Sequence, residues 1–309
     1  MSEHLSNYAA RDHEVVDYKL YELQGVGLRF RGPPRDLPEN GYVSCLGAAQ
    51  TLGCFCEKPF PVLLEEQLGV PMLNLGYGGA GPRFFNRQPE LLDVVNRGRL
   101  AIVQVMSGRS EDNSMFESRG LEVLTRRRDG RRYAADEAWR SVLESGYAWR
   151  RLPFARALAR RVARSFGSRN ALRLAAETRA NYTASLLELL DGITIPTVLL
   201  WFSKRTPEYE PGFENIERFF GAYPQLINRA SIASACEAAD AYVECVTRRG
   251  APQPLISRFT GKPVEIDLAV DRADFRGRKW TENTYYPTPE MHEDAAAALS
   301  GPVSELLNR

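Results

Sequence analysis

The sequence has few histidines, few cysteines and no long apolar run, and each shortage excludes a class of protein. Histidine occurs three times and cysteine five times in 309 residues, and no two cysteines have the Cys-x-x-Cys spacing of a zinc half-site. The longest apolar run, residues 198–202, is far shorter than the roughly 20 residues of a membrane-spanning helix. A secretory signal begins with a basic segment followed by an apolar one, and residues 1–20 do not have this pattern. We therefore expect a cytoplasmic protein with reduced thiols and no metal site.

Neither sign of charge predominates in the chain as a whole, but arginine is concentrated in one segment. Forty basic and thirty-nine acidic residues give a net charge of +1, which argues against a chain-wide binder of polyanions. Residues 119–173 hold fifteen arginines, no lysine and five acidic residues, a net of +10 that leaves −9 for the remainder. Arg156, Arg160 and Arg164 recur every fourth residue beside an apolar helical stripe.

These arginines have two interpretations. They are either a solvated helix face packed on an acidic body, or the rim or lid of a site that attracts an anion. The sequence has no recognisable nucleic-acid-binding module and no aromatic residues interleaved with the arginines, so nucleic acid is not an expected partner.

Short apolar runs separated by helix-length segments predict a parallel sheet. Four runs are typical of buried strands that are apolar on both faces: residues 42–47, 70–75, 100–106 and 195–202. Three segments have helical spacing of apolar residues: 59–68, 82–96 and 290–307. Residues 227–248 also have helical spacing, with a strand at 241–243 as an alternative, and residues 264–268 are a further candidate strand.

The pattern as a whole predicts a three-layer α/β domain with a flavodoxin-like parallel sheet. We expect this single domain over residues 41–309, with an arginine-rich helical insertion over about 119–192. Residues 1–40 are expected to be an N-terminal extension.

A glycine-rich loop follows the second predicted strand. Gly76-Tyr77-Gly78-Gly79-Ala80-Gly81 fits G-x-G-x-x-G at the start of a helix, the arrangement that holds the pyrophosphate of a dinucleotide. The loop follows the second strand rather than the first, and the run about twenty residues further on has no carboxylate to bind a ribose. A nucleotide-cofactor enzyme is therefore one alternative, and a turn that needs positive φ is another.

Several blocks of the chain resemble the SGNH (GDSL) hydrolase superfamily in their order and spacing. Gly47-Ala48-Ala49-Gln50-Thr51 is similar to the family's Gly-Asp-Ser-x-Thr, and residues 74–79 are similar to its Asn-x-Gly-x-x-Gly. Residues 106–113 lie where the third block supplies an asparagine, and His292 lies where the family keeps its catalytic histidine. The resemblance implies an SGNH-like fold with His292 as the base. It also implies oxyanion or substrate contacts at Gly47, Gln50, Thr51, Asn74, Gly79, Ser107, Arg109 and Asn113.

The chain departs from this pattern at the residues that carry the chemistry. Ala49 replaces the serine nucleophile, Ala48 the aspartate before it, and Pro289 the aspartate before the histidine. Acyl-enzyme hydrolysis needs a nucleophile, a base and a group that orients the base, so it is not expected here. Glu290 and Glu293 are near enough in sequence to be candidates for orienting His292. The oxyanion-like residues and His292 remain. They favour binding of an ester, phosphate or sulfate group, or direct transfer between two bound substrates with His292 as the base.

Residues 47–50 also resemble the Gly-Asn-Cys-Gln turn of some bacterial capsule-biosynthesis acyltransferases, without the cysteine. That resemblance implies a nucleotide-bearing donor such as a CoA thioester, whose phosphates would suit the arginine-rich segment. The Gly-Ala-Ala-Gln-Thr opening is also similar to that of an uncharacterised bacterial domain family.

Together these resemblances favour an enzyme, an acyl- or other group transferase or a hydrolase. The substrate would be a carbohydrate, a glycan or another hydroxylated metabolite that is anionic or has an anionic donor. A non-catalytic ligand-binding or assembly protein on the same fold is the alternative. Gln50, Thr51 and Asn74 could satisfy turn backbone groups, and His292 could cap a helix. We expect the site at the carboxyl edge of the sheet, where open α/β folds bind ligands.

Overall fold

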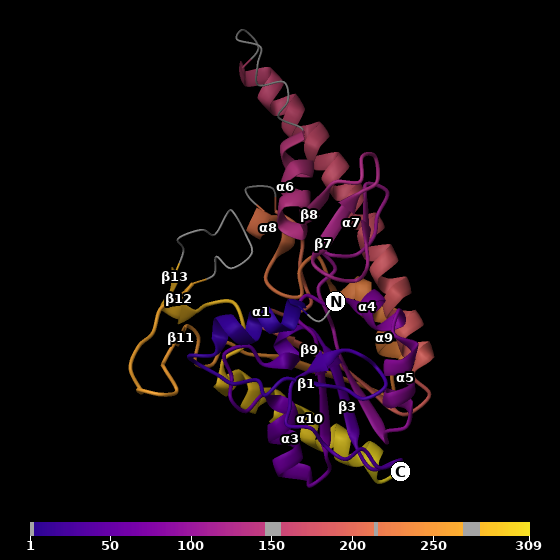
Figure 1. Ribbon diagram of the computed structural model, residues 1–309. Helices are drawn as coiled ribbons and strands as arrows, with labels where there is room; N and C mark the ends of the chain where they lie inside the picture. The colour runs from indigo at the N-terminus through magenta and orange to yellow at the C-terminus, as the bar shows by residue number, and fades with distance from the viewer. Residues whose placement is uncertain (1–2, 146–155, 213–215, 268–278) are drawn as a thin grey trace.

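A parallel sheet of five strands forms the centre of the protein (Figure 1). The computed structural model describes residues 3–145, 156–212, 216–267 and 279–309. Neighbouring strands follow the order β10-β9-β5-β3-β4, and every pair is parallel. The strands are β3 (Val43–Gly47), β4 (Met72–Gly76), β5 (Leu100–Gln104), β9 (Thr197–Ser203) and β10 (Ala241–Val246). The prediction of an α/β fold with a parallel sheet is confirmed.

The order of the strands creates a switch point in the middle of the sheet. The chain begins the sheet at β3, adds β4 on one side, and then crosses to β5 on the other side before continuing outward to β9 and β10. The loops after β3 and β5 therefore leave the same edge in opposite directions. Open α/β sheets bind ligands in the crevice that such a divergence leaves.

Helices cover both faces of the sheet and give three layers (Figure 1). On one face, α3 (Phe60–Leu68) and α10 (Pro289–Leu307) share a hydrophobic cluster with Val43, Ile102 and Val198. The other face carries α2 (Ala49–Leu52), α4 (Pro82–Asn86), α5 (Pro89–Asn96), α9 (Arg229–Ala238) and the second half of α7 (Arg156–Gly192). Because β3, β4, β5 and β9 are buried throughout, their apolar runs are continuous rather than alternating.

Local sequence signals set several of the helix ends. Gly69 ends α3 in the left-handed conformation with φ of 67°, and the Thr288 side chain caps α10 by accepting the Met291 N–H. The single helix predicted over residues 82–96 is wrong, because Pro89 starts a second helix and has no N–H to continue the first. The strand alternative within residues 227–248 is confirmed, since α9 is followed by β10.

A second group of elements, termed the cap, lies above the sheet in Figure 1. The cap comprises residues 116–145, 169–178 and 216–226. Trp139 is fully buried at its centre, with ring centroids 5.5 Å from Phe219 and 6.0 Å from Phe220, so the cap has its own core. Besides part of α7, it contains the antiparallel strands β6 (Phe116–Ser118), β7 (Val123–Arg126) and β8 (Arg132–Ala134), and the helices α6 (Ala135–Ser145) and α8 (Ile216–Phe220).

Residues 3–40 pack into the body of the protein. Leu5, Phe30 and Leu23 belong to the hydrophobic cluster that covers one face of the sheet. The segment forms α1 (Glu3–Asp12), β1 (Tyr21–Glu22) and β2 (Arg29–Phe30).

Two short antiparallel strand pairs lie between β10 and α10 in the sequence. They are β11 (Gln253–Pro254) with β14 (Glu282–Asn283), and β12 (Ile266–Asp267) with β13 (Lys279–Trp280).

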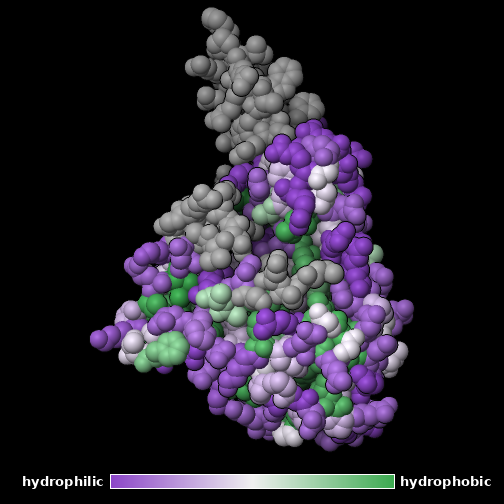
Figure 2. Space-filling model, viewed as in Figure 1, coloured by the Kyte–Doolittle hydropathy of each residue, from purple (hydrophilic) through white to green (hydrophobic). Residues whose placement is uncertain are grey.

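The surface shown in Figure 2 is mostly hydrophilic, with hydrophobic side chains in smaller patches. Among the helices of the described residues, none combines the length and apolar character that crossing a membrane requires.

Buried Arg31 fixes the turn that follows α2. Its guanidinium donates hydrogen bonds of 2.7–3.0 Å to four main-chain carbonyls, those of Leu52, Gly53, Cys56 and Glu57. Carbonyl dipoles, rather than a carboxylate, therefore take up this charge. The contact joins the N-terminal segment to the turn that leads away from β3.

We expect Arg31→Lys to lower the free energy of unfolding by about 2–4 kcal/mol, because a lysine ammonium cannot reproduce the planar fork that reaches four carbonyls. Chemical denaturation followed by tryptophan fluorescence measures the loss. Arg35→Lys is the control, since Arg35 pairs with Glu65 at a partly exposed site and such pairs contribute less than about 1 kcal/mol. Equal losses in the two variants would contradict the role given to Arg31.

Candidate functional site

A cavity of about 420 Å³ lies between the carboxyl edge of the sheet and the cap. On the sheet side its wall consists of Gln50, Arg109, Phe202, Ser203 and Lys204. The cap, the segment before α10 and the first turn of α10 add Asp136, Ile216, Glu217, Phe220, Tyr223, Gln225, Thr284, Tyr285, Pro287 and Met291. The volume is that of a small-molecule site. Two of the residues predicted from sequence, Gln50 and Arg109, are brought together here.

Arg109 connects the sheet edge to the cap. Its Nη1 donates to Asp136 Oδ1 at 2.7 Å, its Nη2 forms an ion pair with Glu122, and its carbonyl accepts the Trp139 Nε1–H at 2.9 Å. Burial acts to lower the pKa of Arg109, but the charges of Glu122 and Asp136 help to raise it well above its ordinary value. The cavity wall therefore contains a cation that stays charged and is held in one position.

Three residues of the cavity wall each hold a buried polar atom with no hydrogen-bond partner in the described part of the chain. These atoms are Oε1 of Gln50, Nε of Arg109 and Oε1 of Gln225, on residues that are 2 %, 8 % and 4 % exposed. The other end of the Gln225 amide is engaged, since Nε2 donates to the Tyr285 hydroxyl at 2.8 Å. An unpaired buried polar atom costs about 1–3 kcal/mol. All three residues line the cavity, so polar side chains form part of its wall.

Gly47 and Thr51 shape the turn that presents Gln50. Gln104 Oε1 accepts the Ala48 N–H at 3.2 Å and the Thr51 hydroxyl at 2.7 Å. A Cβ on Gly47 would overlap both Thr51 Oγ1 and Gln104 Oε1, so only glycine fits. Neither Gly47 nor Thr51 lines the cavity, and both position the turn instead. Sequence reasoning missed Gln104, although an amide within an otherwise apolar strand is a signal that could have found it.

Asn74 joins the loops after β3 and β4. Its Nδ2 donates to the Thr51 carbonyl and its Oδ1 accepts the Gly76 N–H, each at 2.9 Å. Both ends of the amide are therefore occupied by backbone groups, so Asn74 supports the turn rather than the cavity.

The glycine loop is packed against the protein's own side chains. Gly79 has φ of 76°, and a Cβ there would lie 2.7 Å from Cγ of Glu122. A Cβ on Gly78 would lie 2.8 Å from the ring of Tyr8 in α1. The surface predicted to hold a pyrophosphate or an oxyanion is therefore covered by Glu122 and Tyr8, and Gly79 is not part of the cavity wall.

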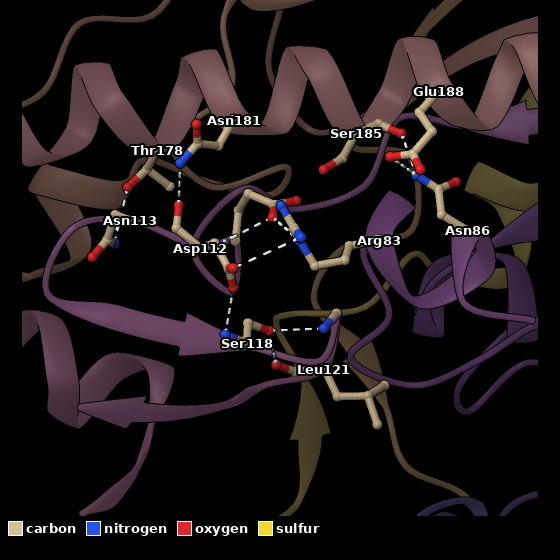
Figure 3. A network of polar contacts seen from close by, with 12 residues as sticks. Arg83, Asn86, Asp112, Asn113, Ser118, Leu121, Thr178, Asn181, Ser185 and Glu188 are labelled. Carbon is tan, nitrogen blue, oxygen red and sulfur yellow. Dashed lines mark hydrogen bonds and ion pairs between the residues drawn. The ribbon is translucent and has the colours of Figure 1, made fainter. Parts of the chain in front are cut away.

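Asn113 and Ser107 organise the loop between β5 and the cap. Asn113 Oδ1 accepts the N–H groups of Met115 and Phe116, and Nδ2 donates to the Thr178 hydroxyl at 3.1 Å. Figure 3 shows this contact within a polar network that ties the loop to α7. Ser107 Oγ accepts the Arg109 N–H at 3.3 Å. The structure does not bring either side chain to the cavity.

His292 lies within the face of the sheet that α3 and α10 cover. Its Nδ1 accepts the Phe60 N–H at 3.1 Å, and its ring centroid lies 6.2 Å from that of Phe60 and 5.3 Å from that of Phe202. Burial, with the charge of Arg31, lowers the pKa of His292 to about 3. A fully buried, neutral imidazole whose neighbour Met291 forms the cavity wall is not placed to take a proton from a ligand there.

The other elements of a hydrolytic site are also separated from the cavity. Ala48 and Ala49 are buried and supply no nucleophile. Glu293, a candidate for orienting the histidine, pairs with Arg249 at 2.7 Å, and the carboxylate of Glu290 lies beside Gly250. Within the described ranges no group of three His, Cys, Asp or Glu residues could hold a metal ion.

Sequence reasoning missed most of the cavity wall. Lys204, Gln225 and Tyr285 come from loops that match no motif, and Asp136 stands at the start of α6. The one available signal was Lys204, a cation placed directly after a strand. The predicted stripe of Arg156, Arg160 and Arg164 lies on α7, but its side chains fall outside the described residues.

The fold and the cavity define an α/β protein with a capped cavity at the carboxyl edge of a five-stranded parallel sheet. The chain belongs to the family described as Domain of unknown function (DUF6473), whose model matches residues 6–307. No curated protein matches the chain.

Two solved structures are similar to the chain at low sequence identity. One is a carbohydrate esterase family 2 enzyme with a carbohydrate-binding domain from Corynascus thermopiles (Myceliophthora fergusii). It is 10 % identical with a TM-score of 0.38, and the match covers 90 % of this chain and 69 % of that one. The other is a proposed acylhydrolase from Bacteroides fragilis. It is 12 % identical with a TM-score of 0.39, and the match covers 98 % of this chain and 97 % of that one.

His292 makes stability depend on pH in a predictable direction. Its pKa is about 3 in the folded protein and roughly 6.5 when unfolded, so the unfolded chain binds the proton first as pH falls. We expect this group to destabilise the fold by about 1.4 kcal/mol per pH unit below roughly pH 6. His292→Phe should reduce the slope of unfolding free energy against pH by that amount between pH 6 and 4.

Phe60→Leu serves as the control for this measurement. It disturbs the packing around His292 without removing an ionisable group, so it should lower stability at every pH and keep the slope. A slope that is the same in His292→Phe and in the unmodified protein would show that the imidazole is not held neutral by burial.

Proposed function

We propose that this protein binds a hydroxylated small molecule, such as a carbohydrate, in the cavity between the sheet and the cap. The observation that carries the proposal is the set of buried polar atoms on Gln50, Arg109 and Gln225 for which the described chain supplies no partner. Two of the atoms accept hydrogen bonds and one donates. A hydroxyl group both donates and accepts, so a molecule with several hydroxyls can pair with all three atoms once these side chains turn toward the cavity.

The rest of the cavity wall suits the same class of ligand. Phe202, Phe220, Tyr223 and Tyr285 supply apolar ring surfaces beside the polar atoms. A sugar ring has apolar faces and a polar edge, and small-molecule sites combine such walls with a few fixed polar groups. The sequence resemblance to SGNH proteins and to capsule-biosynthesis acyltransferases favours the same class of ligand.

The support for the proposal concerns binding more than covalent catalysis. Position 49 is an alanine, His292 is enclosed beside Phe60, and the glycine loop is covered by Glu122 and Tyr8. An acyl-enzyme mechanism needs a nucleophile and a base that reach the same substrate atom. Neither is found on the cavity wall in the form that the superfamily uses.

Replacement of Gln50 tests the proposal. We expect calorimetric titration and thermal shift with a panel of neutral and acidic sugars and polyols to find at least one ligand. Gln50→Leu should lower the affinity for that ligand by about 10–100-fold, because the ligand hydroxyl would then be buried without a partner. Gln67→Leu, at an exposed site on α3, is the matched control and should leave affinity unchanged. If no compound of the panel binds, or if both variants bind alike, this function is excluded.

A second candidate function is direct group transfer or hydrolysis without a covalent intermediate. The carboxylate of Asp136 lines the cavity and is fixed by Arg109 Nη1 at 2.7 Å, so a base is present beside the proposed ligand. In transfer from a thioester donor, a ligand hydroxyl oxygen bonds to the acyl carbon and the carbon–sulfur bond breaks. Asp136 accepts the hydroxyl proton and returns it to the leaving thiolate, so it ends the step unchanged.

Asp136→Asn separates this second function from binding alone. The amide can still accept the Arg109 hydrogen bond but is a far weaker base, so turnover should fall at least about 100-fold while ligand affinity stays within about threefold. Release of acetate from an acetylated sugar, or acetyl transfer from acetyl-CoA, is followed by NMR. Absence of turnover in the unmodified protein, with binding intact, would leave binding as the function.

A further inference from the structure

Lys204, on the cavity wall, and the neighbouring exposed Arg248 have no acidic partner in the described residues. Lys204 follows β9 and lines the cavity, and its Nζ donates to the Thr284 carbonyl at 2.8 Å. Arg248 follows β10, and its Nε donates to the Lys204 carbonyl at 2.8 Å. Neither side chain lies within ion-pair distance of any carboxylate in the described residues. Lys204 is partly buried, and Arg248 is exposed to solvent.

Two other cations at this edge of the molecule are differently placed. Arg109 has Asp136 and Glu122, and Arg249, directly after Arg248, has Glu293 and Asp294 at 2.7 and 2.8 Å. Arg205, directly after Lys204, also has no ion pair in the described residues and donates only to main-chain carbonyls. Of Lys204, Arg205 and Arg248, Lys204 is the one that lines the cavity.

The surroundings of Lys204 make its charge unfavourable when no anion is bound. The side chain is partly buried, and this burial together with the charge of Arg248 lowers the pKa of Lys204. An anion placed beside the two cations would reverse both effects. Two carboxylates also belong to the cavity wall: Asp136 is bound by Arg109, and Glu217 lies exposed on α8 without an ion pair to Lys204.

We propose that the ligand of this cavity carries an anionic group, and that Lys204 binds it. This inference rests on the proposed binding function and narrows its ligand to an acidic sugar or a sugar phosphate or sulfate. The hydroxyl-bearing part of the ligand meets Gln50, Gln225 and Arg109, and its anionic oxygens meet Lys204 at the end of β9. The anion site is thus built by residues of the sheet edge, separately from the arginine-rich segment.

Matched pairs of ligands test the inference by calorimetry. Glucose is compared with glucuronate, glucose 6-phosphate and glucose 6-sulfate, and galactose with galacturonate and galactose 6-phosphate. We expect the anionic member of at least one pair to bind 10-fold or more tightly than its neutral parent. This difference in affinity should become smaller as the salt concentration is raised from 50 to 500 mM, because ionic screening weakens partly exposed charge pairs. The arms of the panel distinguish a carboxylate from a phosphate or a sulfate.

Variants of Lys204 complete the test. Lys204→Met should reduce the affinity of the anionic ligand to that of its neutral parent, and Lys204→Arg should keep most of the gain. Lys58→Met, at an exposed lysine paired with Glu66, is the control and should change neither affinity. Thermal melting of each variant verifies that it is folded, and Lys204→Arg keeps the test informative if the methionine variant is unstable.

The outcomes separate this inference from the function on which it rests. If neutral ligands bind and their anionic counterparts bind no more tightly, the anion site is wrong while the proposed function stands. The same holds if Lys204→Met weakens neutral and anionic members equally. If no member of any pair binds, the proposed function fails and this inference fails with it.

Discussion

The arrangement of the cavity depends on one buried cation, Arg109. A guanidinium at this depth is stable only with its charge compensated, and the two carboxylates that compensate it, Asp136 and Glu122, both come from the cap. The main-chain carbonyl of the same residue holds Trp139, the centre of the cap's own core. The cap therefore cannot leave the sheet edge without exposing a buried charge. The atom of Arg109 that the cap does not use, Nε, is buried and has no hydrogen-bond partner in the described residues.

The fold could be predicted from the sequence where a pattern was long or a signal was chemical. Continuous apolar runs identified β3, β4, β5 and β9 because strands buried on both faces have no polar side to interrupt them. Gly69 marked a helix end because glycine readily adopts the left-handed conformation, and Thr288 marked a helix start because its side chain can cap the helix. The strands of the cap were missed because β6–β8 have only three or four residues each, and such short segments have no measurable period.

The candidate site was predicted only in part, for a different physical reason. Gln50 and Thr51 are adjacent polar residues in one turn, yet Gln50 reaches the cavity while Thr51 binds Gln104. A polar side chain near a turn can satisfy either the backbone or a ligand, and its sequence does not say which. Lys204, Gln225 and Tyr285 meet only because loops far apart in the chain leave the same edge. A motif records local spacing, so it cannot contain a convergence of this kind.

Unpaired polar groups also affect which ligands the cavity can distinguish from one another. Each buried atom without a partner costs the ligand-free protein about 1–3 kcal/mol, so the atoms on Gln50, Arg109 and Gln225 lower its stability. A ligand that pairs all three removes this cost, whereas an analogue that lacks one hydroxyl leaves one atom unpaired. Sites built to hydrogen-bond a hydroxyl reject analogues without it far more strongly than apolar pockets reject a missing methylene group. Under the proposed function, Gln50, Arg109 and Gln225 would therefore select a particular hydroxylated molecule over apolar compounds in general.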